Sequence, residues 1–349
     1  MSYSQRDLSL NILLLGGLLA AIGCVRQPEN AVVIYTAADR EYSQPILDAF
    51  ERRSSGVEVV AQFDVEATKS VGLANRIQSE SLKPQCDIFW NNELMHTLNL
   101  EKQGLLQSIR WDIPSDWPGN MRSPQGNWVG IAARGRVLIV SRDLLPDAEQ
   151  WPTSVMDLAD PKWAGRCGVA FPLFGTTATH FTILMEQLGE EKAIEFFQKV
   201  VGNAIVLSGN KQVALQVASG RLAWGLTDTD DALIEIDAGM PVEIVFPDQQ
   251  PHQPGTLRIP NSVAVIANCP HPVAAAQLAN FLVSEDTEGR LAMGSSGQFP
   301  IRPHHPQASR AGLDFAGNRL MIRWMEADFS LAADRWPDAS ARLNSIFKK

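Results

Sequence analysis

Three carboxylates follow an apolar run in the second half of the chain. Residues 222–226 read Leu-Ala-Trp-Gly-Leu, and Asp228, Asp230 and Asp231 come directly after this run. Carboxylate oxygens suit hard cations such as Ca²⁺, Mg²⁺, Mn²⁺ and Fe³⁺, and no Cys/His spacing in the chain is typical of a zinc site. The same aspartates have a second interpretation, because Asp228 and Asp231 are spaced like the N-cap and N3 residues of a helix over 232–236. The run therefore predicts a ligand site or an acidic helix start.

Other acidic and amide residues follow predicted strands. Asp39 comes after the apolar strand 31–36, and Asn92 and Glu93 come after the strand 86–90. In an open parallel sheet, ligands bind beyond the carboxyl ends of the strands, so we expect these side chains at one edge. A cleft that held all the acidic residues would need protons or cations to neutralise it. The predicted metal ligands are Asp39, Glu93, Asp228, Asp230 and Asp231.

Strands and helices alternate along the chain, and this order predicts the α/β class. The strands are expected at 31–36, 57–63, 86–90, 135–141, 167–171, 222–226 and 262–267. The helices are expected at 42–53, 70–79, from about 176 to 188, 210–218 and 273–283. From about residue 289 onward the pattern is helical only in patches.

A second group of side chains could hold an anion across the same cleft. Thr176 and Thr177 precede a long helical pattern, and Asn210, Lys211 and Arg134 add donors and positive charge. Each has a simpler interpretation: a threonine can cap the helix, and a single basic residue is commonly a solvated surface charge. The ligand class therefore stays open between a metal cation and an anionic or polar organic molecule.

Composition narrows the classes of function. The chain has 349 residues and a formal net charge of −9, without a basic run, which argues against a nucleic-acid partner. This length exceeds one ordinary core, so two domains are expected. Cys86, Cys167 and Cys269 are expected to be small buried hydrophobic residues. No Gly-x-Ser-x-Gly or His-Glu-x-x-His motif is present, so an exported hydrolase is the less favoured alternative.

The N-terminus resembles a bacterial lipoprotein signal. An apolar run at 8–22 is too short for an ordinary membrane span and ends just before Cys24. We expect residues 1–23 to be removed and Cys24 to carry the lipid, which places the protein outside the cytoplasm on a membrane. The alternative is an uncleaved N-terminal anchor helix.

Four runs of the sequence resemble bacterial extracellular solute-binding proteins, nearest to their ferric-iron-binding branch. They are YTAADREYSQPILDAFE, CDIFWNNELMHTLNLEKQGLL, SGNKQVALQVASGRLAWGLTDTDD and IPNSVAVIANCPHPVAAAQLANFLVSEDTEGRLA. The resemblance implies a two-lobed periplasmic-binding-protein-like fold of type II, with a mixed sheet flanked by helices in each lobe and the ligand between the lobes. It implies residues 31–103 plus 259–313 for lobe 1, and 104–258 plus 314–349 for lobe 2.

The resemblance also implies a role. Such a protein is a monomeric, non-enzymatic capture subunit that delivers a solute to an ABC permease, in the periplasm or at the cell surface. Iron-binding members carry two adjacent tyrosines after the block that reads LAWGL here, but this chain has Asp230 and Asp231 at those positions, and Asp39 stands where such members carry a His or another donor. The resemblance thus implies a carboxylate-rich site for Fe³⁺ or a hard divalent ion, or a site for a phosphorylated or other polar organic solute.

Overall fold

The computed structural model describes residues 31–64, 70–314 and 316–348. The signal predicted at 1–23 and the lipidation predicted at Cys24 lie outside these residues. Within the described residues no helix is long and apolar enough to cross a membrane.

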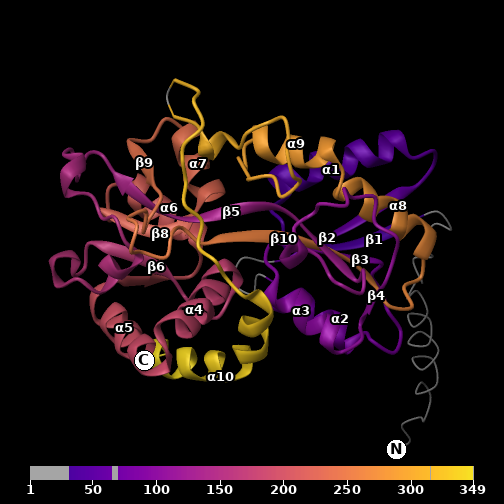
Figure 1. Cartoon of the computed structure of the whole chain (residues 1–349), viewed down its shortest axis with the longest axis horizontal. Coiled ribbons are helices and arrows are strands. Elements are labelled where there is room, and N and C mark those ends of the chain that lie inside the picture. The colour runs from indigo at the N-terminus through magenta and orange to yellow at the C-terminus, as the bar shows by residue number, and fades with distance from the viewer. Residues whose placement is uncertain (1–30, 65–69, 315, 349) are drawn as a thin grey trace, which may run out of the picture.

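The strands form one mixed sheet, and two of them run through its middle (Figure 1). Along the sheet the order is β2-β1-β3-β10-β5-β8-β6-β7, with β4 against β10 and β9 against β5. The bounds are β1 Ala31–Thr36, β2 Glu58–Phe63, β3 Ile88–Asn91, β4 Leu106–Gln107, β5 Trp128–Ser141, β6 Cys167–Ala170, β7 Ile205–Leu207, β8 Trp224–Asp228, β9 Val242–Val245 and β10 Arg258–Ile266.

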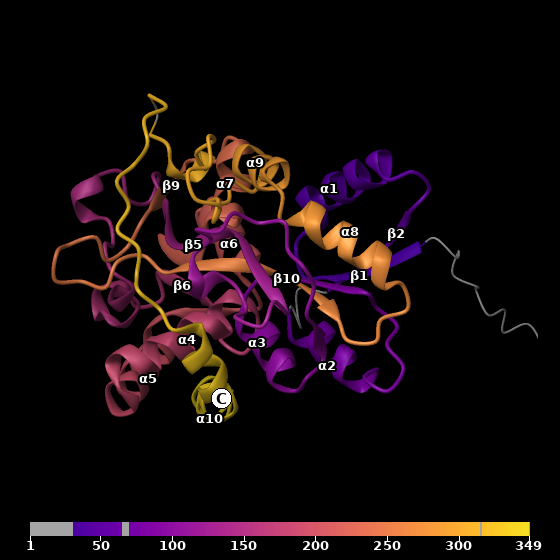
Figure 2. The same ribbon diagram turned by 45° about the vertical axis from the view of Figure 1, so that its right-hand side comes forward.

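Helices cover both faces of this sheet (Figures 1 and 2). Their bounds are α1 Arg40–Arg53, α2 Val71–Ser79, α3 Met95–Lys102, α4 Gly175–Leu188, α5 Glu190–Asn203, α6 Asn210–Ala218, α7 Thr229–Asp237, α8 Pro272–Leu282, α9 Glu285–Met293 and α10 Phe329–Phe347. Strand–helix alternation with parallel pairs β1–β2, β1–β3, β6–β7 and β6–β8 confirms the predicted α/β class.

Strand β5 links the two halves of the sheet. All 14 of its residues are buried; its first part pairs with β10 and its second part pairs with β8 and β9. One large apolar cluster lies around β1, β3 and β10, and another lies around β6, β8, α4 and α5. The first cluster also contains Met121 and Val129, so packing assigns the start of β5 to the first half. The lobe division at residue 103 stays a prediction.

Several predicted elements coincide with the observed ones. Strand 31–36 and helix 210–218 have the predicted bounds. The strand predicted at 222–226 instead lies at Trp224–Asp228, and the following helix begins at Thr229 rather than at residue 232. The predicted strand at 135–141 is the second half of the longer β5. Cys86, Cys167 and Cys269 are buried free thiols, as expected for small apolar residues.

Candidate functional site

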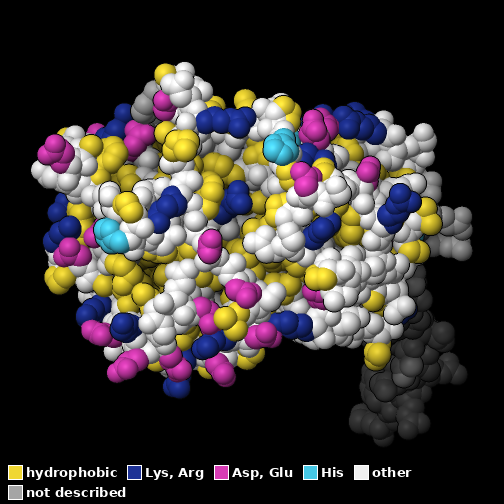
Figure 3. All heavy atoms as spheres, in the orientation of Figure 1, with side chains coloured by type: hydrophobic (Ala, Val, Ile, Leu, Met, Phe, Trp, Pro, Cys, Tyr) yellow, Lys and Arg dark blue, Asp and Glu magenta, His cyan; other side chains and the backbone are white. Residues whose placement is uncertain are grey.

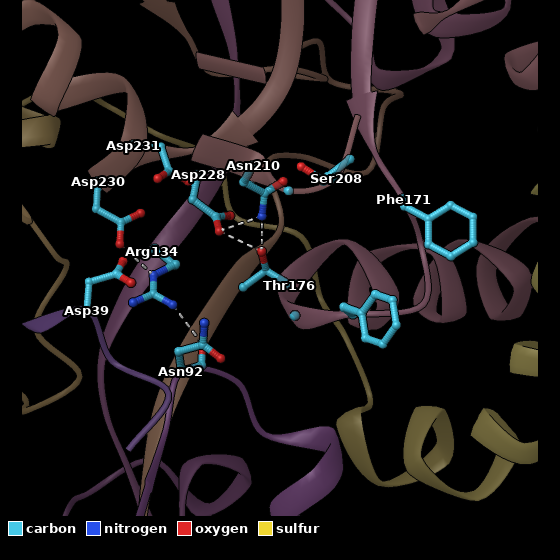
Figure 4. Close-up of a pocket in the computed structure, with 14 residues that line it drawn as sticks. Asp39, Asn92, Arg134, Phe171, Thr176, Ser208, Asn210, Asp228, Asp230 and Asp231 are labelled. Atoms are coloured by element: carbon cyan, nitrogen blue, oxygen red, sulfur yellow. Dashed lines mark hydrogen bonds and ion pairs between the residues drawn. The ribbon is translucent and has the colours of Figure 1, made fainter. Parts of the chain in front are cut away.

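A polar pocket lies where the two halves of the sheet meet, and Figure 4 shows its side chains. It encloses about 400 Å³, including its open mouth. The carboxyl ends of β1, β3, β6, β7 and β8 all deliver residues to it, because parallel strands end at the same edge. Its lining consists of Asp39, Asn92, Arg134, Ala170, Phe171, Phe174, Gly175, Thr176, Ser208, Gly209, Asn210, Asp228, Asp230 and Asp231.

Three of the four carboxylates in this pocket form a tight group. One oxygen of each of Asp228, Asp230 and Asp231 lies within 4.8 Å of the others, so the three carboxylates could hold one cation. Asp228 ends β8, while Asp230 and Asp231 lie in the first turn of α7. The helix start is therefore acidic, as the alternative interpretation expected. Asp228, however, occupies the N-cap position without a side-chain capping hydrogen bond.

The Asp228 carboxylate is held by an arginine instead. Arg136 Nη1 lies 2.7 Å from Asp228 Oδ1, and both side chains are almost completely buried. The other Asp228 oxygen accepts hydrogen bonds from the Thr176 hydroxyl at 2.5 Å and the Asn210 amide at 3.1 Å. A buried group stays ionised when it has a counter-charge and hydrogen bonds, and Asp228 has both.

Arg136 also contacts a buried histidine behind the pocket. Its Nε donates to Nδ1 of His180 at 3.4 Å. Burial, and then the charge of Arg136, hold the pKa of His180 well below the usual value of a histidine. His180 is therefore neutral, and it adds no positive charge to the pocket.

A second arginine crosses the pocket from β5. Arg134 Nε lies 3.1 Å from Asp230 Oδ2, and its guanidinium also donates to the Asn92 carbonyl and to the Tyr42 hydroxyl. Tyr42 in turn donates to Asp230 at 3.3 Å, so α1 of the first half is connected to α7 of the second half. Burial alone lowers the pKa of Arg134, but Asp230, Tyr42 and other acidic neighbours more than offset it and raise the pKa.

Carboxylates outnumber arginines at the pocket. Four carboxylates line it, whereas two guanidinium groups, Arg134 and Arg136, are paired with two of them. Asp39 accepts a hydrogen bond from Tyr42, Asp231 accepts one from Thr227, and the charge of Lys211 acts on both carboxylates. Four carboxylates in a partly desolvated pocket favour a cation as ligand.

The structure does not bring every predicted residue to the pocket. Of the predicted set, Asp39, Asn92, Arg134, Thr176, Asn210, Asp228, Asp230 and Asp231 line it. Glu93 does not: it is fully buried and accepts hydrogen bonds from the backbone N–H of Met95 and His96 at the start of α3 and from the Thr179 hydroxyl. The N–H groups at the start of this helix bind the carboxylate, so Glu93 lies outside the pocket lining, and its role as a metal ligand stays a prediction without support from its contacts.

Two predicted anion ligands have other partners. Thr177 lies behind the pocket, where its hydroxyl accepts from Arg136 and donates to Asn210. Lys211 is half-exposed and lies 3.3 Å from Glu41, outside the pocket lining. Neither threonine caps α4 through its side chain, because the N-cap residue is Phe174 and both hydroxyls contact Arg136.

Some pocket residues were not predicted. Arg136 stands two positions after Arg134 in a strand, so both side chains share one face, and this period of two could have identified it. Tyr42 carried no such signal, because its place follows from the packing of α1. Phe171 and Phe174 form a half-exposed aromatic wall, with ring centroids 6.2 Å apart.

A two-part α/β fold with a charged pocket between its parts is typical of proteins that bind a small solute between two lobes. A sequence model of this class matches residues 32–292, and the chain belongs to the family of bacterial extracellular solute-binding proteins. The predicted fold and the predicted absence of enzymatic activity agree with this family. Its members carry solutes for import from outside the cytoplasm.

Named relatives include proteins of iron uptake. Iron uptake protein A2 of Synechocystis is 28% identical over 252 residues, which cover 67% of this chain and 70% of that protein. The Fe(3+)-binding periplasmic protein of Serratia marcescens is 25% identical over 215 residues, covering 61% and 62%.

Solved structures of this fold include iron-bound and sugar-phosphate-bound proteins. Iron-bound HitA of Pseudomonas aeruginosa superposes with a TM-score of 0.76 at 22% identity, covering 90% of this chain and 99% of HitA. AfuA of Actinobacillus pleuropneumoniae, with fructose-6-phosphate bound, gives 0.77 at 19% identity, covering 91% and 98%. At these identities the likeness establishes the fold only.

Proposed function

We propose that this protein captures a hard, multivalent metal cation, Fe³⁺ foremost, in the carboxylate pocket and delivers it to an ABC permease. The observation that carries the proposal is the group of Asp228, Asp230 and Asp231, whose ligand oxygens lie within 4.8 Å of one another. The iron-related names of the relatives support the same ligand class.

The charge of the pocket favours a cation over an anion. Both arginines are already paired with an aspartate, so an incoming phosphate would meet neutralised guanidinium groups and two further carboxylates. Like charges at about 4 Å repel by about 4 kcal/mol at an effective dielectric constant near 20. A multivalent cation is attracted by the same carboxylates that would repel the phosphate.

The arginines have a role in this scheme as organisers of the empty site. They hold Asp228 and Asp230 in place by ion pairs of 2.7 and 3.1 Å. Figure 4 shows Asp39 and Asp230 on one side of Arg134, with Asp228 directed toward Thr176 and Asn210. The predicted metal ligands in the pocket are thus Asp39, Asp228, Asp230 and Asp231.

The test replaces both first-turn aspartates of α7. In Asp230→Asn/Asp231→Asn the amides can still serve the helix start but carry no charge. The variant should fold with a lower melting temperature than the wild type, because Arg134 loses its buried partner Asp230, so each protein is compared with and without metal. Iron supplied as ferric nitrilotriacetate and retained after gel filtration is then measured by elemental analysis, and melting temperature is followed with Fe³⁺, Mn²⁺ and Ca²⁺. The wild type should retain metal in a one-to-one ratio and melt at a higher temperature with it.

A matched control is Asp143→Asn, which removes an exposed carboxylate in a turn outside the pocket. The control should retain metal like the wild type, whereas the double variant should retain none. Undiminished metal binding in the double variant would exclude the aspartates as ligands.

A second candidate is a polar organic solute, and the aromatic wall favours it. Phe171 and Phe174 line the pocket beside the amide of Asn210, and a bare metal ion needs neither ring. Fructose-6-phosphate and free phosphate serve as probes in the same melting assay. Stabilisation by the sugar phosphate that survives Asp230→Asn/Asp231→Asn would favour this candidate over the cation.

The finer aspects of transport are part of the same proposal. We infer that Cys24 carries a lipid, that the lipid is the sole membrane anchor, and that the protein acts as a monomer at the permease. Membrane association that remains unchanged in Cys24→Ser, with the N-terminus intact, would contradict the lipid anchor.

A further inference from the structure

A second pocket lies beside strand β10 and is lined by positively charged side chains, unlike the carboxylate pocket. It encloses about 930 Å³, including its open mouth, between the start of β10 and the segment 299–324. Three arginines, Arg258, Arg302 and Arg319, line it together with His304 and His305, and none of its lining residues is acidic. In a chain with a net charge of −9, this concentration of cations requires an explanation.

Arg258 is the most informative residue of this pocket. Its guanidinium carbon lies 5.2 Å from the centre of the Trp324 ring, and within the described chain its side chain has no hydrogen bond or ion pair. Burial lowers the pKa of Arg258, while Glu288 raises it. The oxygens of Glu288, however, already accept from the backbone N–H groups of Ala132, Ile301 and Arg302 at 2.8–2.9 Å.

Arg258 is partly buried, and its unused N–H groups can donate to an anion that enters the pocket. The other two arginines also keep donors for a ligand. Arg302 donates to the Val283 carbonyl and its Nε lies 4.0 Å from Glu288, whereas Arg319 donates to the Pro306 carbonyl. Each therefore uses only part of its five N–H groups.

This pocket is separate from the carboxylate pocket. In the β5–β10 pair, Arg258 lies opposite Gly135, and Ile259 lies opposite Arg134. Side chains alternate between the two faces of a strand, so Arg258 and Arg134 point to opposite faces. Figure 3 shows the side of the molecule that faces the viewer in Figure 1, where several Lys and Arg side chains lie near hydrophobic ones over β5 and β10.

We propose that this pocket binds a small organic anion. Its carboxylate or phosphate group pairs with Arg258, Arg302 and Arg319, since guanidinium groups match the geometry of these anions. Its apolar body lies against Trp324, Ile322 and Leu320, which line the same pocket. This site is independent of the solute that the carboxylate pocket captures.

The test titrates the full chain with phenyl phosphate and with inorganic phosphate by isothermal calorimetry. The wild type should bind phenyl phosphate more tightly than inorganic phosphate, because only the former contacts the apolar wall. Arg258→Gln and Arg319→Gln should each weaken binding about tenfold or more, the effect of one lost charge-assisted hydrogen bond. The control Arg110→Gln, an exposed arginine outside the pocket, should bind like the wild type.

Three results would overturn the proposal. The first is that the wild type does not bind phenyl phosphate at millimolar concentration. The second is that Arg258→Gln and Arg319→Gln bind it as tightly as the wild type, and the third is that Arg110→Gln loses as much affinity as they do. If Arg258→Gln does not fold, Arg319→Gln decides, because Arg319 is exposed and its removal leaves no buried charge. Asp230→Asn/Asp231→Asn should keep phenyl phosphate binding; its loss there would place the anion in the carboxylate pocket.

Discussion

Replacing Arg136 with glutamine should destabilise the ligand-free protein strongly. The guanidinium is fully buried, lies 2.7 Å from Asp228, and donates to Thr176 and Thr177 at 3.0 Å. Its removal leaves the Asp228 carboxylate in a buried site with hydrogen bonds but without a counter-charge. Breaking a buried ion pair from one side costs about 3–5 kcal/mol.

A double-mutant cycle with Asp228→Asn measures the interaction energy of the Arg136–Asp228 pair. The single variants Arg136→Gln and Asp228→Asn each leave one buried charge, whereas the double variant leaves none. Because the two residues are in direct contact, their effects should not add, and the double variant should recover at least about 2 kcal/mol relative to the sum. Urea unfolding at pH 7 measures all four proteins, and Arg136→Gln should also melt about 5–15 °C below the wild type.

The cycle has a clear negative outcome. If Arg136→Gln is as stable as the wild type, or if the two substitutions add within about 0.5 kcal/mol, the pair does not hold the pocket together. A multivalent cation should stabilise Arg136→Gln more than it stabilises the wild type, since it then replaces the guanidinium that was in contact with Asp228. Equal stabilisation of both proteins would argue against metal contact with this carboxylate.

Three further outcomes follow from the same contacts. Tyr42→Phe removes a hydroxyl that accepts from Arg134 at 2.8 Å and donates to Asp230 at 3.3 Å, so urea unfolding should show a loss of about 1 kcal/mol, and an unchanged midpoint would contradict this. Because the pKa of His180 in the folded protein lies well below that of an unfolded histidine, only the unfolded chain gains this proton as the pH falls below about 6.5, and stability should decrease there by up to about 1.4 kcal/mol per pH unit. His180→Gln should flatten that decrease in urea titrations at pH 7.5 and 5.5, and an identical pH profile in the variant would exclude His180 as its source. Gly225→Ala should destabilise the protein by about 1–3 kcal/mol, since the added Cβ would lie 2.3 Å from Val213 Cγ1 and 3.0 Å from the Gly168 carbonyl; a neutral result in thermal melts would mean that α6 shifts freely.

Local patterns predicted the elements well where one segment decides its own structure. The uninterrupted apolar run at 31–36 is a strand buried on both faces, and the spacing over 210–218 is a helix that ends before Ser219 and Gly220. The strand after residue 222 was placed two positions too early. There the polar residues Thr227 and Asp228 continue the ladder, because they pair with Val137 and Arg136 of β5.

The candidate site was predicted in part for the same reason. Asp39, Asn92 and Asp228 follow parallel strands, and parallel strands end at one edge, so their meeting is a consequence of strand order. Glu93 has the same position in the sequence as these residues, yet it bonds to the N–H groups of α3. The residue type and the position after a strand are the same for a carboxylate that lines the pocket and for one that binds a helix start, so the sequence does not distinguish them.

The sequence alone determined the class, the order of elements and the family, because these depend on periodicity and on blocks of neighbouring residues. The pairing of each charge was decided by the tertiary structure. Arg136 and Asp228 are 92 positions apart, and Tyr42 and Asp230 are 188 apart, so only the register of β5 with β8 and the packing of α1 bring them together. Whether a buried carboxylate is paired or available to a cation depends on these distant contacts, since electrostatic energy follows separation in space and burial rather than distance along the chain.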